Sequence, residues 1–370
     1  MSSKSEKRTT MLTVPARWLL GACVATCMAG AGVAQAEAPR DGRIGYVLTY
    51  KSFGIYEAED GSECPDGLND GPRELYSKEF PDDGTVRTVM ETRLMSEGRN
   101  MHPTASQGEF PYYEVQSDIA YGLNLDGKVG PNSFQSPDGE PGIDNQLYRA
   151  VGCTMNYRAD GSLRHFANVY MWSYSNNRWM IEVTDVDDLS NDDEVTVTTY
   201  RGIDQLLPHA SGEVFRSAPG GTQNVDMRWG KEFIGQAQGK IVDGVLTTQP
   251  LEKTLIPWGS AFNTSGFQSF RDVRFKLNLT AETAEGILGG YADINKFNHH
   301  LKTTFATHHL SYGQQSASAE YAALRRNADA YPDPETGENT AISMALAVKM
   351  IQAYILHPDS APEGSALTSR

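Results

Sequence analysis

Oxygen-bearing side chains and glycines are densest between Asp118 and Gln146, a combination typical of calcium-binding loops. Ca²⁺ takes about six to eight oxygen ligands, and glycine lets the backbone turn sharply around the ion. The stretch does not match the EF-hand pattern, because Gly122 and Ser133 stand where two acidic ligands are required. The alternative is an ordinary solvated loop in which the same residues only form turns. The candidate calcium ligands are Asn124, Asp126, Asp138, Glu140 and Asp144.

Four histidines near the C-terminal end form a second group that could do chemistry: His299, His300, His308 and His309. Neutral imidazole is a common ligand of copper, zinc and iron, so the cluster indicates a transition-metal site in a metalloenzyme or redox protein. On one continuous helix, His300 and His308 would lie about 12 Å apart along the axis, so one ion would require a break between them. The alternatives are histidines that hydrogen-bond or face solvent, and a catalytic acid or base.

The cysteines and the N-terminus indicate an oxidising compartment. The first 36 residues carry a basic start, an uncharged stretch from Trp18 to Ala34 and a small-residue cleavage site at Ala34–Ala36, as secretory signals do. A lipoprotein modified at Cys23 and a retained anchor are the alternatives. Cleavage leaves Cys64 and Cys153, which we expect to form a disulfide. The sequence therefore predicts a secreted or periplasmic protein without a membrane span after cleavage.

Charge and missing motifs exclude several functions. The formal net charge is −15, and losing residues 1–36 removes four basic side chains and one acidic one, which makes it −18. Such an acidic chain is a poor partner for nucleic acid or an anionic membrane. No nucleophile elbow, zinc-protease helix, phosphate-binding loop or haem-attachment motif occurs. These absences favour a non-catalytic binding or structural protein, stabilised by the disulfide and by calcium.

The pattern of elements predicts strands first and helices last. Strands are expected at 43–56, 164–174, 178–186, 195–201, 226–238, 239–248 and 271–279, with Asp243-Gly244 as a turn. In the last of these strands Val273, Phe275, Leu277 and Leu279 share one face. Helices are expected at 280–288, 291–310, 317–330 and 340–356, the last being apolar nearly all round, and 146–157 is expected as a short helix or a strand.

This order predicts an α+β fold: a β-rich, sandwich-like core with a C-terminal helical region packed on it. We expect three parts, namely a signal peptide at 1–36, a β-rich domain at 37–280 with its Asp/Gly-rich loop at 118–146, and a helical region at 281–370.

Aromatic residues suggest the kind of partner. They gather around the predicted strands and could form a platform for sugar rings, although such residues more often pack in the core. The ligand is therefore left open between a glycan and a protein partner. The residues are Tyr46, Tyr50, Tyr112, Tyr113, Tyr170, Trp172, Tyr174 and Trp179.

Overall fold

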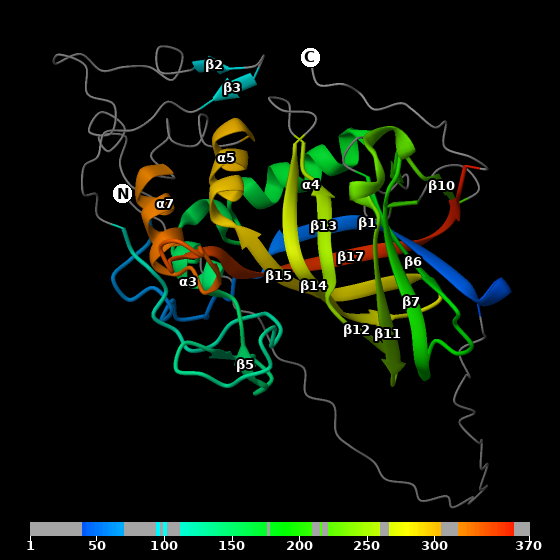
Figure 1. Ribbon diagram of the computed structural model, residues 1–370, viewed down its shortest axis with the longest axis horizontal. Helices are drawn as coiled ribbons and strands as arrows, with labels where there is room; N and C mark the ends of the chain where they lie inside the picture. Colours follow the sequence, from blue (N-terminus) through cyan, green and yellow to red (C-terminus); the bar gives the residue numbers. More distant parts are fainter. Residues whose placement is uncertain are drawn as a thin grey trace, which may run out of the picture. The chain divides into compact units, whose positions relative to one another are not determined.

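The structure is a computed structural model in which β-strands predominate over helices, with 45% of residues in strands and 19% in helices (Figure 1). The described residues are 39–69, 94–96, 99–101, 112–175, 178–208, 215–216, 221–259, 266–304 and 317–358.

The central element is a closed antiparallel β-barrel of eight strands. β1 and β17 close the barrel, and they run side by side in Figure 1 with partners from Gly45–Ala353 to Phe53–Leu346. Closure gives each of these eight strands a neighbouring strand on both sides along at least part of its length. In order around the barrel the strands are β1 (Arg43–Phe53), β6 (Trp179–Thr184), β7 (Asp192–Arg201), β11 (Gly235–Val242), β12 (Val245–Thr248), β14 (Phe267–Leu279), β15 (Thr283–Asp293) and β17 (Asn339–Leu356).

One further strand lies outside the ring of eight and pairs with β14. β14 is the partner of β12 along its second half and of β13 (Leu251–Pro257) along its first half. β15 then leads directly into helix α5 (Ile294–Thr304), which packs against β14. The β13–β14 hairpin and α5 therefore stand beside each other at this end (Figure 1).

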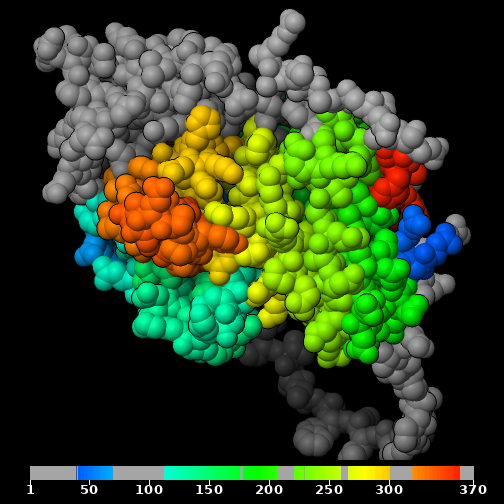
Figure 2. All heavy atoms as spheres, viewed as in Figure 1, coloured from blue at the N-terminus to red at the C-terminus, as the bar shows by residue number. Residues whose placement is uncertain are grey.

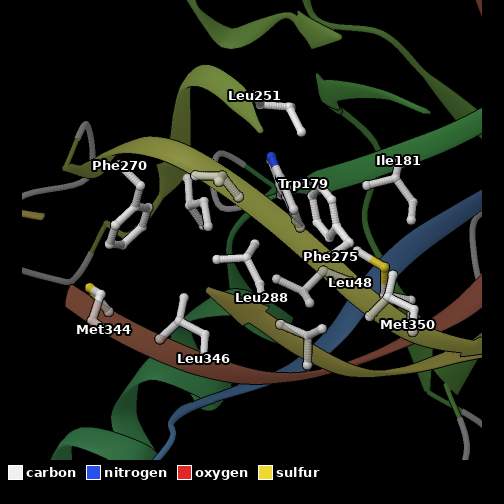
Figure 3. Close-up of a cluster of buried hydrophobic side chains, with 14 of the residues drawn as sticks. Leu48, Trp179, Ile181, Leu251, Phe270, Phe275, Leu288, Met344, Leu346 and Met350 are labelled. Atoms are coloured by element: carbon white, nitrogen blue, oxygen red, sulfur yellow. The ribbon is translucent and has the colours of Figure 1, made fainter. Parts of the chain in front are cut away.

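Apolar side chains fill the barrel interior (Figure 3). Trp179 and Phe275 stack at 6.0 Å between ring centroids, and Leu48, Leu288 and Leu346 pack with them in the same buried cluster. A filled interior is usual for a barrel of eight strands, so the centre of this barrel is a core rather than a channel.

Smaller elements cover the outside. Helix α4 (Ser162–Ser173) packs on β1, while α3 (Gln146–Val151) and α7 (Ala317–Arg326) pack on β17. Within the described ranges, no helix has the length and apolar character needed to cross a membrane. The other strands are β2 (Leu94–Ser96), β3 (Arg99–Met101), β4 (Phe134–Gln135), β5 (Pro141–Ile143), β8 (Leu207–Pro208), β9 (Phe215–Arg216), β10 (Thr222–Asn224) and β16 (Ala330–Pro332). The short 3₁₀ helices are η1 (Arg40–Gly42), η2 (Met155–Tyr157), η4 (Met227–Trp229) and η5 (Lys231–Phe233).

The disulfide predicted from the sequence is confirmed: Cys64 and Cys153 are bonded, with their Cα atoms 5.7 Å apart. Both lie in a small buried cluster outside the barrel, together with Phe134, Ile143 and Tyr148. The bond thus holds together the ends of a long segment that includes the Asp/Gly-rich loop.

Several predicted elements are confirmed. The strands at 178–186 and 195–201 are β6 and part of β7, and the face of Val273, Phe275, Leu277 and Leu279 is buried on β14. The Asp243-Gly244 turn joins β11 and β12, with positive φ at both residues (51° and 77°), as a tight hairpin turn requires. Helices at 291–310 and 317–330 are confirmed in shorter form as α5 and α7.

The predicted fold class is wrong, because the sheet closes into a barrel instead of forming a sandwich and helices are few. The C-terminal helical region is wrong as well: 340–356 lies in strand β17, and 283–288 lies in strand β15. The first part of β17, Ala341–Leu346, is buried on both faces, because its inner face fills the barrel and α3 and α7 pack on the strand. A strand buried on both faces has a continuous apolar pattern that periodicity cannot distinguish from a buried helix.

The opposite error occurs at 164–174, where a strand was expected and helix α4 is found. Its buried apolar residues are Leu163, Ala167 and Met171, which recur every four positions along one helical face. The aromatic residues between them have a high strand propensity, but this buried face decides the structure.

Candidate functional site

A pocket of about 580 Å³ lies between the β13–β14 hairpin and α5, and it is here called the α5 pocket. On the face shown in Figure 2, the gold surface of α5 meets the yellow and yellow-green surfaces of β14 and β13. The register explains the hollow. β14 is longer than its partner, since its first pair with β15 is Phe270 with Ala292. On that side, Phe267–Ser269 pair with no strand among the described residues.

α5 is held in place at its start. The carboxylate of Asp293 accepts a hydrogen bond from the backbone N–H of Lys296 (2.9 Å) and lies 3.9 Å from the guanidinium of Arg271. A carboxylate that caps the first turn of a helix satisfies an N–H group that has no partner inside the helix. Asp293 therefore fixes the turn from β15 into α5, which is the wall opposite β14.

The floor of the α5 pocket is apolar. Leu255, Phe270, Ala292 and Phe297 line it, and each is no more than 3% exposed. Phe267 lies nearer to solvent at 44% exposure, with its ring edge-on to Phe233 at 5.8 Å. Carbon surfaces on several sides suit an apolar ligand, because binding removes apolar surface from water.

One polar side chain interrupts this apolar floor. Gln268 lines the pocket and is 4% exposed, and its carbonyl oxygen Oε1 is buried with no hydrogen-bond partner among the described residues. Gln268 and Phe270 are two residues apart on β14, so their side chains leave the strand on the same face. A buried polar atom without a partner costs about 1–3 kcal/mol, so it is uncommon in a folded protein.

Charged groups stand at the mouth of the pocket. Lys253, Lys296 and Glu232 are exposed lining residues from β13, α5 and η5. The entrance therefore carries charges of both signs, whereas the floor formed by Leu255, Phe270, Ala292 and Phe297 is uncharged.

A buried lysine, Lys51, lies against Trp258, and the Trp258 ring in turn contacts the pocket-lining His300. His300 lines the pocket at 5% exposure, and its ring lies edge-on to Trp258 at 6.4 Å. The ammonium of Lys51 is 3.9 Å from the centroid of the Trp258 ring and donates a hydrogen bond to the carbonyl of Pro257 (2.9 Å). Burial lowers the pKa of Lys51 to about 7. Burial, then the charge of Lys51, lowers the pKa of His300 to about 3, so this imidazole is neutral at pH 7.

The predicted calcium ligands lie on the Asp/Gly-rich loop, and four of them already have protein partners. Asp144 accepts hydrogen bonds from the backbone N–H groups of Leu125 (2.7 Å) and Asp126 (3.1 Å). Asn124 accepts one from Gly127 N–H (2.7 Å), Asp126 accepts one from Lys128 N–H (2.8 Å), and Glu140 pairs with Lys276 at 2.6 Å. Asp138 is exposed. Among the described residues, no group of three or more His, Cys, Asp or Glu side chains is placed to hold a metal ion.

The histidine cluster is only partly described. His299 and His300 are neighbours on α5, but His299 is exposed whereas His300 is buried. His308 and His309 lie outside the described residues. The prediction of a transition-metal site stays a prediction.

The aromatic residues proposed as a sugar platform are divided between core and surface. Tyr46 and Trp179 are fully buried in the barrel, and Tyr113 and Tyr174 are exposed. Tyr50 and Trp172 line a second, more open groove of about 500 Å³ beside α4, together with Asp160, Arg164 and His165. These eight residues thus do not make one platform.

The sequence reading missed the α5 pocket because the strand was expected to begin at Arg271, after Gln268 and Phe270. A signal was present, since a glutamine stands on the face of β14 that continues with Phe270. A polar residue at an inward strand position marks either a hydrogen-bonded core group or a ligand contact.

No family model, curated protein or solved structure matches this chain.

Proposed function

We propose that this protein is an exported, non-catalytic binding protein that holds a small, mainly apolar molecule in the α5 pocket. The observation that carries the proposal is a pocket of about 580 Å³ whose floor is formed by the apolar side chains of Leu255, Phe270, Ala292 and Phe297. Small-molecule sites commonly have volumes of about 300–1,000 Å³, with apolar walls and a few polar groups that orient the ligand.

The ionisable groups of the pocket support binding rather than catalysis. Asp293 is engaged by the start of α5 and by Arg271. A general base works best with a pKa near the working pH, and His300 has a pKa of about 3. This agrees with the absence of a complete catalytic motif in the sequence.

Export is supported by two separate features. The N-terminal 36 residues have the pattern of a secretory signal. The Cys64–Cys153 disulfide is the kind of bond that persists in an oxidising compartment.

The proposal is tested with N-phenyl-1-naphthylamine, a neutral dye whose fluorescence rises in apolar sites. Wild-type protein should bind one equivalent and melt at a higher temperature with the dye, because the dye binds the folded state. Ser269→Trp adds a bulky ring to a half-buried lining position and should abolish binding. Gln238→Trp places the same ring on an exposed position of β11 and should leave binding unchanged. Absence of saturable binding to wild type, or equal binding by both variants, would reject the α5 pocket as the site.

A further inference from the structure

We infer that the groove beside helix α4 is a second ligand site and that it binds a neutral saccharide. This groove, here called the α4 groove, has a volume of about 500 Å³, and none of its lining residues lines the α5 pocket. The inference therefore goes beyond the proposed function and does not depend on it.

Side-chain contacts between α4 and β1 form the base of the α4 groove. The amide of Asn168 accepts a hydrogen bond from the backbone N–H of Lys51 (3.0 Å) and donates one to the Lys51 carbonyl (2.9 Å). The indole N–H of Trp172 donates to the carbonyl of Thr49 (2.7 Å). β1 pairs with β6 only as far as Val47, so these two side chains bind the next backbone groups of β1 in place of a strand. The groove is thus formed by the fold itself, as small-molecule sites commonly are.

Two aromatic side chains supply apolar surface in the groove. Tyr50 and Trp172 both line it, and both are half-buried, so part of each ring is open to solvent. Lys51 points into the barrel, and its neighbour Tyr50 therefore points to the outer face of the sheet. The C–H faces of a sugar ring pack well against aromatic rings, because contact removes apolar surface of both from water.

Polar groups of opposite hydrogen-bonding character lie beside these rings. The guanidinium of Arg164 donates a hydrogen bond to the carbonyl of Ala159 (3.2 Å) and lies 5.5 Å from the centroid of the Tyr50 ring. Arg164 can only donate hydrogen bonds, and the exposed carboxylate of Asp160 can only accept them. Neighbouring hydroxyl groups of a sugar both donate and accept, so one ligand of this class satisfies both side chains.

Charge decides between neutral and acidic saccharides. The chain is strongly acidic, which repels a polyanion. Arg164 and Asp160 offset each other within the groove, so its own side chains do not overcome that repulsion. A free amino acid also carries a donor and an acceptor of opposite charge, and it is the competing ligand that the test must separate.

Affinity electrophoresis of the mature protein tests the inference. Each native gel contains one soluble polysaccharide. The neutral set is hydroxyethylcellulose, laminarin, xyloglucan, galactomannan and dextran, and the acidic set is polygalacturonate and alginate. At least one neutral polysaccharide should retard wild type, and the acidic ones should not. Calorimetric titration with an oligosaccharide of the polysaccharide that retards it then measures Kd.

Two substitutions test the polar groups. Asp160→Ala should weaken binding about tenfold or more, because a hydrogen bond to a charged group is lost. Arg164→Lys keeps the charge but loses the planar fork of donors, and it should weaken binding by a similar factor. Asp160 is exposed, so its variant should melt at the wild-type temperature. Asp193→Ala, the same change at an exposed aspartate of β7, should leave binding unchanged.

Tyr50→Ala tests the apolar wall and should weaken binding about fivefold or more, because the sugar loses a ring to pack against. Its matched control is Tyr354→Ala, which removes a tyrosine that is 60% exposed on β17 and lies outside the groove. This control should bind as wild type does.

Each other result overturns the inference. Retardation by no polysaccharide of the neutral set rejects a saccharide ligand, and retardation by the acidic set alone rejects a neutral one. Equal binding by wild type, Asp160→Ala and Tyr50→Ala rejects the α4 groove as the site. Binding of phenylalanine that Asp160→Ala abolishes, without binding of any saccharide, assigns the groove to an amino acid instead. The saccharide should not displace N-phenyl-1-naphthylamine, because the two sites share no lining residue.

Discussion

The ammonium of Lys51 lies 3.9 Å from the centroid of the Trp258 ring, inside one end of the barrel. Lys51 is 1% exposed, and its position opposite Val348 on β17 directs its side chain to the inner face of the sheet. The ring face offers a cation favourable electrostatics, and the carbonyl of Pro257 accepts one hydrogen bond from the ammonium. These contacts only partly replace water, which is why burial lowers the pKa of Lys51 to about 7.

Lys51 should therefore make the stability of the protein depend on pH between about 7 and 10. The folded-state pKa lies below the unfolded value of 10.5, so the contribution is fully present above pH 10.5 and is lost as the pH falls towards 7. The largest slope is about 1.4 kcal/mol per pH unit, because one unit of pKa corresponds to that free energy. Below pH 7 both states carry the proton, and this slope ends.

Lys51→Met has a similar shape and no titrating group, so it should lack this slope. Urea unfolding of both proteins at several pH values measures the difference in free energy of unfolding. The substitution also leaves the Pro257 carbonyl without its partner, but that cost does not change with pH. A difference that stays constant from pH 7 to pH 9.5 would show that Lys51 is not desolvated as the structure indicates.

The Cys64–Cys153 disulfide should contribute several kcal/mol to stability. The two residues are 89 positions apart, and in the chain-entropy model closing a loop of this length gives about 4–5 kcal/mol. The double variant Cys64→Ser/Cys153→Ser should lower the free energy of unfolding by about 3–5 kcal/mol. Wild type unfolded in the presence of a reductant should reach the same value, and the reductant should not affect the variant. Equal stability of wild type and variant would contradict the prediction.

Part of this loss of stability should arise near Arg158, which contacts both Glu63 and Cys64. Its guanidinium pairs with the buried carboxylate of Glu63 at 2.6 Å and contacts Cys64 Sγ at 3.6 Å. A buried carboxylate needs such a partner, since an uncompensated buried charge costs several kcal/mol. Proteolysis of the double variant should therefore begin near Glu63 and Arg158 and leave the barrel strands intact at first.

How far the sequence predicts this fold depends on how each segment is buried. β14 was recognised because its second half alternates, with Phe275 and Leu277 inside and Lys276 and Asn278 outside. β17 was not recognised, because Ala345 and Ala347 on one face and Leu346 and Val348 on the other are all apolar. Closure of the sheet depends on the pairing of β1 with β17, two segments nearly 300 positions apart, and no local pattern reports that contact.

The candidate site could not be predicted from the sequence for a similar reason. Gln268 and Phe297 line the same pocket because β14 extends beyond its first pair with β15 and α5 follows β15 directly. The strand register determines this arrangement, and register is a property of pairs of strands. The disulfide was predictable because two cysteines in the exported chain leave a single intramolecular pairing.

Export should remove the first 36 residues. N-terminal sequencing of the protein recovered from outside the cytoplasm should begin at or near Glu37, because Ala34-Gln35-Ala36 is a small-x-small cleavage site. Ala36→Arg should block processing and leave a larger precursor. A mature protein that begins at a lipidated Cys23, or one that still carries its initiating methionine, would contradict the prediction.

The Asp/Gly-rich loop should respond to calcium in a way that separates two of its aspartates. Asp144 is 9% exposed and holds the backbone N–H groups of Leu125 and Asp126, and its pKa is raised mainly by burial. Asp144→Ala should therefore lower the free energy of unfolding by about 1–3 kcal/mol with or without calcium, because two buried or half-buried donors lose their acceptor.

Asp126 should behave differently, because its side chain is 42% exposed and its ion pair with Lys128 is long at 3.9 Å. Such a surface pair contributes about 0–1 kcal/mol, so Asp126→Ala should have almost no effect in chelator. If the loop binds calcium, wild type gains about 2.7 kcal/mol at a hundredfold excess of Ca²⁺ over Kd, and Asp126→Ala loses that gain. Thermal melts and limited proteolysis of wild type, Asp126→Ala and Asp144→Ala, each with calcium and with chelator, measure both effects. Wild type that melts and is cut identically in calcium and in chelator would reject calcium binding, and the loop would then be held by its protein contacts, among them those of Asp144 with its backbone donors.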